Sequence, residues 1–501
     1  MRSIRILGLL LLTVAPLAFG QSTSQATQAA ATITASDVKT HIHFLASDEL
    51  KGRDTPSPGL EAAAKYIADK FASYGLKAAG DSGSYIQRWP FKARKLDVAK
   101  LTVELQGQSA AQTLKFASDY FVIPASTGDS LSGEIVFAGA AAPTLQASPA
   151  YAGKIVAFYA PGGELSAEWQ QALQATAIAG ITSGARGLVF ILDPAFDAIK
   201  IGGIASNISA ANSPIPSIGV RNDLARSWLT GTGVEPAATV PAEPKPVAGA
   251  RVRVVTAMAG NTANPPNVVA ILEGSDPELK NTYVVYSAHM DHVGVGSPDA
   301  KGDSIYNGAD DDASGTTAIM EVAQAFSTMK QRPKRSIIFL TVSGEEKGLF
   351  GSKHFTEHPP VPADKMIANI NLDMIGRNAA DSTVAIGQEY STLGTITQAV
   401  VKAHPELKLT VAPDLWPQER LFFRSDHYNF AMKKIPAIFF TSGLHADYHK
   451  PSDQPETIDN DKLARTAQLV FWLGHEIANS ATAPAWTEAG LKATNQKTAG
   501  N

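Results

Sequence analysis

The sequence predicts an α/β protein whose mostly parallel mixed sheet is flanked by helices and whose chain is interrupted by a second, β-rich domain. Two observations predict this class. After about residue 250, continuous apolar runs alternate with segments of helical periodicity, and such runs are typical of strands covered on both faces. Between about 125 and 249 the composition changes to glycine, alanine, proline and short β-runs with few acids.

The apolar runs define the strands of the first domain, and the segments between them define its helices. Two further helices are expected between residues 35 and 80, where apolar residues recur at helical spacing and Gly75 ends the second helix. The expected strands are 267–274, 282–289, 336–344, 366–373 and 435–443, and the later helices are 314–330, 391–404 and 460–479.

The domain boundaries follow from the change in composition. We expect a discontinuous first domain (21–124 and 250–482), an insert (125–249) and a flexible tail (483–501). A proline-rich stretch at 234–250 closes the insert. A chain of 501 residues is long enough for two or three domains.

Residues 1–20 have the features of a secretory signal peptide. Two arginines precede an apolar run broken by Pro16, and Ala18 and Gly20 occupy the −3 and −1 positions of a cleavage site. We therefore expect export to the periplasm or the medium without stable membrane insertion. An N-terminal anchor that is retained is the alternative.

Composition excludes several function classes. The formal net charge is −4 and no long basic run is present, so no nucleic-acid partner is expected. The chain contains no cysteine, which excludes disulfides, a cysteine nucleophile and cysteine-ligated zinc. Any metal ion must therefore be bound by His, Asp and Glu. Nothing in the sequence indicates the oligomeric state.

Acids and histidines follow the ends of the expected strands. In open α/β sheets, ligands bind beyond the carboxyl ends of the strands, so these side chains are expected to meet at one edge. They are His289 and Asp291, Glu345 and Glu346, Asp373, the loop with His445 and His449, and the motif NGADDDASG at 307–315.

Several carboxylates that converge on one crevice need positive charge to remain ionised. Nitrogen and carboxylate ligands without thiolates suit Zn²⁺, and also Mn²⁺ or Co²⁺. Two ions that share one carboxylate would bind a water molecule and polarise a carbonyl. Taken singly, each motif also has a structural interpretation: an exposed helix start for the acids, and a hydrogen-bonded core residue for His289. Together, at several strand ends, the motifs favour a site.

Five motifs together resemble the family-28 metallopeptidases, which include dizinc aminopeptidases, glutamate carboxypeptidases and transferrin-receptor relatives. The resemblance covers about 36–110 and 255–480, and the insert resembles the protease-associated domain often found there. The motifs, in the order of the family, are AHMDHVG, NGADDDASG, SGEEKGLFGS, NLDMIG and DYHKPSD.

The resemblance implies a ligand set for two Zn²⁺ ions. His289 and Asp373 would bind one ion, Glu346 and His449 would bind the other, and Asp310 would bridge both. His292, His427 and His445 are expected to lie outside this set.

The resemblance also implies the supporting residues. Glu345 would be the general base, and Asp291 would orient His289 from behind. Asp311 would support a peptide bond that is cis in family members, and Asp312 would cap the helix that starts near Ser314.

Two further positions have two interpretations each. Ser425 and Asp426 either cap a helix or support the site. Tyr448 either donates a hydrogen bond to the oxyanion of the tetrahedral intermediate or is a packed aromatic residue.

The expected function is a secreted dizinc exopeptidase that acts on peptides, most simply an aminopeptidase. A glutamate-releasing carboxypeptidase or a dipeptidase is the alternative, and Arg377, Arg420 and Arg424 are its candidate ligands for a free carboxylate. The intact acid motifs disfavour a single-zinc glutaminyl cyclase. The complete ligand set disfavours a receptor that has lost its metals.

Overall fold

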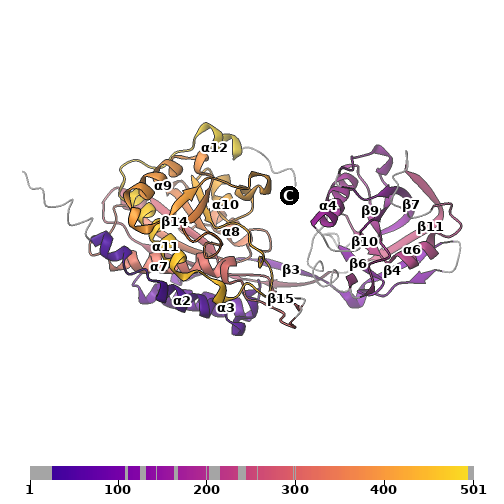
Figure 1. Cartoon of the computed structure of the whole chain (residues 1–501), viewed down its shortest axis with the longest axis horizontal. Coiled ribbons are helices and arrows are strands. Elements are labelled where there is room, and N and C mark those ends of the chain that lie inside the picture. Colours follow the sequence, from indigo (N-terminus) through magenta and orange to yellow (C-terminus); the bar gives the residue numbers. More distant parts are fainter. Residues whose placement is uncertain are drawn as a thin grey trace, which may run out of the picture. The chain divides into compact units, whose positions relative to one another are not determined.

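The computed structural model describes residues 25–494, apart from 108–110, 124–130, 143, 163–166, 199, 202–214, 235–243, 257, 297 and 300. The expected signal peptide (1–20) lies outside the described residues. The chain divides into two compact units, one formed by Met1–Phe91 with Asn264–Asn501 and the other by Lys92–Ala263 (Figure 1). Each unit has its own sheet.

The first unit contains a mixed, nine-stranded sheet whose centre is parallel. Strands β17, β14, β18 and β21 are parallel neighbours, whereas β13 and β19 join this centre in antiparallel orientation. The expected apolar runs are confirmed as strands. The order is β1 (Lys77–Ala78), β13 (Pro266–Leu272), β17 (Ser336–Val342), β14 (Tyr283–His289), β18 (Met366–Leu372), β21 (Ala437–Thr441), β19 (Ser382–Ile386) and β20 (Thr410–Ala412), with β2 (Ile86–Arg88) paired to β13.

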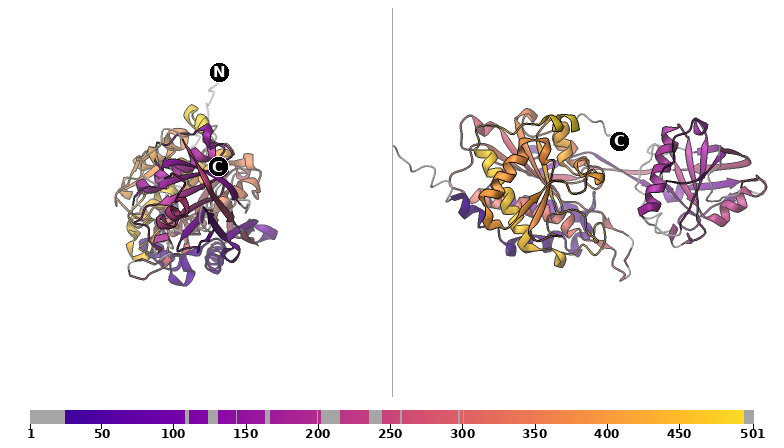
Figure 2. Two further views of the ribbon diagram at one scale, coloured as in Figure 1. Left: turned by 90° about the vertical axis from the view of Figure 1, so that its right-hand side faces the viewer. Right: turned by 45° about the horizontal axis from the view of Figure 1, so that its top comes forward.

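Helices cover both faces of this sheet (Figures 1 and 2). Successive strand residues point to opposite faces, so Tyr286 and Val285 of β14 enter different apolar clusters. One cluster includes residues of α2 (Ala35–Leu45), α3 (Pro58–Ser73), α7 (Gly315–Thr328), α9 (Thr392–Ala403) and α11 (Asn460–Asn479). The other includes residues of α8 (Phe350–Glu357), α10 (His427–Met432) and α12 (Glu488–Ala493).

The second unit is built on an eight-stranded sheet. Two apolar clusters cover it, and it carries α4 (Ala167–Thr182) and α6 (Asn222–Leu229). Separately, β3 (Phe91–Leu96) pairs with β12 (Met258–Ala263). The sheet order is β5 (Gln112–Thr113), β4 (Thr102–Gln106), β11 (Lys245–Val255), β7 (Leu131–Ala140), β8 (Ile155–Ala160), β9 (Gly187–Leu192), β10 (Ser217–Val220) and β6 (Tyr120–Ile123).

The expected domain boundaries were too narrow for the second unit. We assigned the strands before residue 125 to the first domain, but β4 pairs with β11 and β6 pairs with β10. Strand pairing between distant segments decides which unit a strand joins, and local composition does not reveal it.

The expected flexible tail is wrong for the described part of 483–494. Trp486 donates a hydrogen bond from Nε1 to the carbonyl of Lys434, and Ala493 of α12 is buried in the second apolar cluster of the first unit. Residues 495–501 lie outside the described part. Within the described helices, none has the length and apolar composition needed to cross a bilayer.

Candidate metal and active site

The parallel strands bring the expected side chains to one edge of the first unit's sheet. β14 ends at His289, the turn after β17 carries Glu345 and Glu346, and Asp373 follows β18. Nε2 of His289 lies 3.5 Å from Oδ1 of Asp373. The carboxyl ends of parallel neighbours therefore meet as the sequence predicted.

Two groups of potential metal ligands share one residue, Asp311. The first group is His289, Asp311 and Asp373, and in the second, His292, Glu346 and His449 surround the same carboxylate. Within each group, one candidate ligand atom from every residue lies within 4.8 Å of the others. Oδ1 of Asp311 is 3.2 Å from Nε2 of His289, and its Oδ2 is 3.1 Å from Nε2 of His449.

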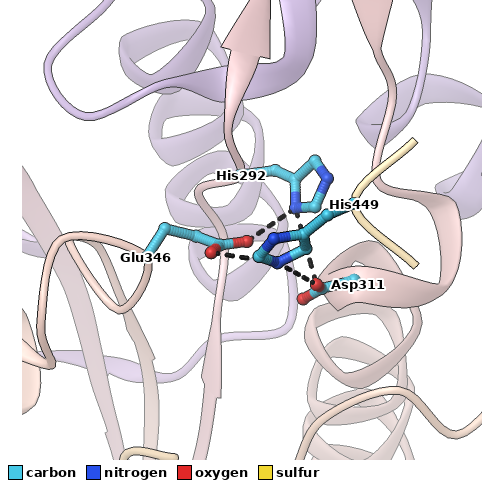
Figure 3. A group of neighbouring side chains, drawn as sticks. All are labelled: His292, Asp311, Glu346 and His449. Carbon is cyan, nitrogen blue, oxygen red and sulfur yellow. Dashed lines mark ion pairs between the residues drawn. The ribbon is translucent and has the colours of Figure 1, made fainter. Parts of the chain in front are cut away.

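Glu346 contacts both histidines of the second group (Figure 3). Its Oε1 is 2.8 Å from Nδ1 of His292, and its Oε2 is 3.2 Å from Nε2 of His449. Although burial raises the pKa of Glu346, its contacts with the two histidines lower it to about 2. Burial likewise lowers the pKa of His449, but hydrogen bonds to Asp311 and Glu346 raise it to about 10. Glu346 and His449 therefore form an ion pair.

The structure corrects the expectation that Asp310 bridges the two groups. Its Oδ1 accepts a hydrogen bond of 2.6 Å from the Gly376 amide, and its Oδ2 lies 3.3 Å from Nε2 of His445. Asp310 therefore faces away from both groups. The amides of Asp310 and Asp311 both donate to the carboxylate of Asp453, which holds this turn so that the second aspartate faces the other ligands.

The structure places His292 in the second group, whereas the ligand set implied by the sequence leaves it out. It is fully buried, its Nδ1 faces Oε1 of Glu346, and its Nε2 has no hydrogen-bond partner among the described residues. The signal in the sequence is its place three residues after His289, at the end of a buried strand. His445 and His427 do lie outside both groups: His445 contacts Asp310, and the His427 ring stacks on Phe439.

Asp291 lies behind His289, as expected. Nδ1 of His289 is 3.1 Å from the carbonyl oxygen of Asp291 and 3.7 Å from its Oδ1. The Asp291 carboxylate in turn accepts hydrogen bonds from the Thr55 hydroxyl and the Gly344 amide. These contacts fix the orientation of the imidazole that faces Asp311.

Asp312 supports the start of α7, as expected. Its Oδ1 accepts a hydrogen bond of 2.8 Å from the amide of Gly315, the first residue of the helix, and its Oδ2 accepts one of 3.2 Å from the amide of His289. Burial raises the pKa of Asp312 well above its usual value. The peptide bond between Asp311 and Asp312 is cis, as the resemblance implies.

Ser425 supports the site, and Asp426 does not cap α10. The Ser425 hydroxyl donates a hydrogen bond of 2.7 Å to Oδ2 of Asp373. No side-chain hydrogen bond caps the start of α10 at Asp426. Of the two interpretations of this segment, the contact with Asp373 selects the supporting role for Ser425.

A cavity opens beside the two groups, and Glu345 and Tyr448 both line it. Burial raises the pKa of Glu345 well above its usual value, and the charges of Glu346 and Asp373 act in the same direction. The Tyr448 ring stacks on His449 with centroids 4.0 Å apart, and burial raises the pKa of its hydroxyl. Tyr448 is thus a packed aromatic residue whose protonated hydroxyl can act as a donor. The other lining residues are Asp311, Asp373, Met374, Leu421, Arg424, Ser425, Phe439, Thr441, Gly443 and Leu444.

Comparison with known proteins agrees with this geometry. The sequence model of peptidase family M28 matches residues 267–473, which carry every residue of both groups. The matched segment starts in β13 and ends in α11, so it contains the parallel centre of the sheet.

Curated relatives of this chain include fungal proteins. A probable zinc metalloprotease of Pyrenophora teres f. teres is 37% identical over 115 residues, which is 23% of each chain. A probable leucine aminopeptidase of Arthroderma benhamiae is 24% identical over 261 residues, covering 50% of this chain and 69% of that protein. The chain spans about a quarter of the length of the first curated relatives it matches.

Solved structures share the fold. The aminopeptidase from Aneurinibacillus sp. strain AM-1 superposes with a TM-score of 0.56 at 20% identity, covering 92% of this chain and 97% of that one. The zinc aminopeptidase BSAP from Bacillus subtilis has a TM-score of 0.56 at 17% identity, with 90% and 97% covered. At these identities, the likeness concerns the fold.

Proposed function

We propose that this chain is an exported dizinc aminopeptidase that removes N-terminal residues from peptides. The observation that carries the proposal is the position of Asp311, whose two carboxylate oxygens face two separate groups of histidines and acids. A carboxylate shared in this way is what a two-metal hydrolytic site requires. The names of the relatives and of the solved structures support the same activity.

The donor set fits Zn²⁺. Imidazole nitrogens and carboxylate oxygens without thiolates suit zinc, and Mn²⁺ or Co²⁺ are alternatives. His289 and Asp373 would bind one ion, Glu346 and His449 the other, with Asp311 shared and His292 beside the second. Nε2 of His292 is buried without a hydrogen-bond partner among the described residues, while its Nδ1 and both oxygens of Glu346 face the other side chains of the group.

Glu345 and Tyr448, which line the cavity, would each have a defined chemical role. The ions, when bound, would polarise the scissile carbonyl and lower the pKa of a water molecule. Glu345 would take a proton from the attacking water at its carboxylate and return it to the leaving amine. The Tyr448 hydroxyl would donate a hydrogen bond to the developing oxyanion.

The lining of the cavity favours substrates with an apolar first side chain. Met374, Leu421, Phe439 and Leu444 give the cavity apolar lining, and the acids that also line it would attract a free α-amino group. The role of the insert as a protease-associated domain stays a prediction. Export, which residues 1–20 indicate, also stays a prediction.

One observation favours a carboxypeptidase as the second candidate. Arg424 lines the cavity, and its Nη1 lies 3.5 Å from Oε2 of Glu419. The other two candidate carboxylate ligands are engaged elsewhere, since Arg377 pairs with Asp447 and Arg420 lies over the Phe423 ring. Arg424 is therefore the residue that would bind the free carboxylate of a carboxypeptidase substrate.

Peptides with free and acetylated N-termini distinguish the two activities. We expect the purified protein to release residues from a free-amine series and not from the N-acetylated twins, to lose activity on chelation and to regain it with zinc. Equal activity on the acetylated peptides would favour the carboxypeptidase. Activity that survives complete removal of metal would contradict both.

A further inference from the structure

A segment before α3, residues 45–55, contacts three loops of the candidate site. Asn307 donates hydrogen bonds from Nδ2 to the carbonyl of Ala46 and to Oδ1 of Asp48. At the other end, the Thr55 hydroxyl donates to Oδ2 of Asp291 and accepts from the amide of Gly344. The segment therefore touches the loops that carry His289, Asp311 and Glu345.

Arg53 is the most buried long side chain of this segment, with 1% of its surface exposed. Each hydrogen bond that its guanidinium donates goes to a backbone carbonyl. Nε donates to Met290 at 2.8 Å, Nη2 donates to Gly308 at 2.8 Å, and Nη1 donates to Asn307 at 2.7 Å and also to Leu45.

These contacts join the two loops that present the metal-ligand candidates. Met290 lies directly after His289, and the amide of His292 donates a hydrogen bond of 3.3 Å to the carbonyl of Arg53. Gly308 begins the turn that leads to Asp311. One planar guanidinium thus sets the spacing between the histidine loop and the aspartate turn, because its donors have a fixed geometry.

The backbone conformation of residues 51–53 directs the Arg53 side chain toward these carbonyls. Lys51, Gly52 and Arg53 all have positive φ values. A Cβ atom at Gly52 would lie 2.4 Å from the Tyr306 carbonyl oxygen and 2.5 Å from that of Gly294, so only glycine allows this close approach. The loops and the segment are packed too closely for Arg53 to move independently.

The positive charge of Arg53 lies near four acidic side chains. Burial lowers the pKa of Arg53 to about 10, opposed by the charges of Asp291, Asp453, Asp311 and Asp312, so the guanidinium remains protonated at neutral pH. It therefore supplies one permanent positive charge beneath the acids.

We propose that Arg53 is a positioning residue that holds the His289–His292 loop and the Asn307–Asp311 turn at the spacing that the metal ligands need. The inference rests on the proposed function, since it assumes that these loops bind zinc. It assigns Arg53 no contact with substrate. Its effect is exerted through the carbonyls of Met290, Asn307 and Gly308.

Arg335 is a matched control, because it is another buried arginine that donates to backbone carbonyls. It is 2% exposed and donates to the carbonyls of Ser480 and Ala481 at 3.1 Å each. It precedes Ser336, the first residue of β17, whereas Glu345 follows the other end of that strand. Loss of Arg335 should cost stability without affecting the metal ligands.

The experiment compares Arg53→Met, Arg53→Lys and Arg335→Met with the wild type. Zinc affinity is measured by competition with a chelating dye, and ligand geometry by the visible spectrum of the Co²⁺-substituted protein. The melting temperature, kcat and KM of each variant are also measured. Partners that orient metal ligands typically contribute 10–100-fold to metal affinity, so we expect Arg53→Met to weaken zinc binding by about tenfold or more and to alter the cobalt spectrum. Arg335→Met should lower only the melting temperature.

Arg53→Lys keeps the charge but not the planar fork, so zinc binding should remain weaker than in the wild type. If Arg53→Met does not fold, the Arg53→Lys variant tests the positioning role by itself. Unchanged zinc affinity and cobalt spectrum in the folded Arg53 variants, or full recovery in Arg53→Lys, would overturn the positioning role. A wild type that binds no zinc would instead overturn the proposed function, and this inference with it.

Discussion

Oδ2 of Asp311 lies 3.1 Å from Nε2 of His449, so the turn before α7 and the loop after β21 meet at one carboxylate. Its other oxygen faces His289 at the end of β14. A single side chain therefore links three separate segments of the chain. Asp310, its immediate neighbour, takes part in neither contact and instead accepts a hydrogen bond from Gly376.

The two neighbouring aspartates should respond differently to the same substitution. Asp311→Asn keeps the shape of the side chain but removes the shared charge, so we expect bound zinc to fall below two ions per chain and kcat/KM to fall by about a hundredfold or more, which corresponds to about 2.7 kcal/mol. Asp310→Asn should retain both ions. Metal content after dialysis and kcat/KM on a free-amine peptide measure the effect.

The opposite pattern, with zinc lost in Asp310→Asn and retained in Asp311→Asn, would restore the assignment made from the sequence. The Asp310 carboxylate is buried, so a moderate loss of stability in Asp310→Asn is expected in either case. Metal content is therefore the deciding quantity.

Much of the site could be predicted because strand ends are readable from sequence. Continuous apolar runs marked β14, β17 and β18, and parallel pairing places the residues after them at one edge. His289, Glu346, Asp373 and His449 followed from the pattern of strand ends, and the family resemblance assigned them to two ions.

The choice among the three aspartates and the boundary of the second unit both depend on contacts between residues that are far apart in the sequence. Which of three consecutive aspartates faces the ligands depends on hydrogen bonds from the turn to Asp453, a residue far along the chain. The ligand set that the resemblance implies does not include His292, which lies in the second group. The boundary of the second unit depends on the pairing of β4 and β6 with distant strands, which composition does not encode.

Glu345→Gln should separate proton transfer from metal binding. The amide cannot accept the proton of the attacking water, so kcat should fall by about 10²–10⁴-fold while KM and zinc content stay close to those of the wild type. Glu346→Gln is the matched control at the next position, and it should lose zinc because Glu346 lies within hydrogen-bond distance of His292 and His449. Discontinuous assays on the free-amine peptide series measure kcat and KM, and metal analysis measures the zinc content. Substantial loss of zinc in Glu345→Gln would instead place that residue among the ligands.

Zinc should stabilise the folded chain strongly. Without it, Asp311, Glu346 and Asp373 are close together and only partly compensated by histidines, and an ion that binds the folded state alone adds about 2.7 kcal/mol at one hundred times its dissociation constant. We expect the melting temperature to fall on chelation and to rise with added zinc. Calorimetry across a zinc series measures this, with Asp311→Asn as the variant that should lose part of the gain. A melting temperature independent of zinc would contradict a bound ion.

Lys462 should give stability an alkaline pH dependence. Its side chain is fully buried and Nζ donates to the Arg377 carbonyl and to the Ser442 hydroxyl. Burial lowers the pKa of Lys462 from 10.5 to about 8, so the unfolded chain binds more protons between these pH values. The contribution of Lys462 to the free energy of unfolding therefore rises with pH across that window.

Lys462→Met lacks this titration, so the difference in free energy of unfolding, wild type minus variant, should grow between pH 7.5 and 9.5. Urea unfolding of the two chelated proteins at both pH values measures it, and the double difference cancels every titration that the proteins share. Lys365→Met, at an exposed lysine, is the control and should show a difference that is flat with pH. A flat difference for Lys462→Met as well would mean that this ammonium keeps its solution pKa in the fold.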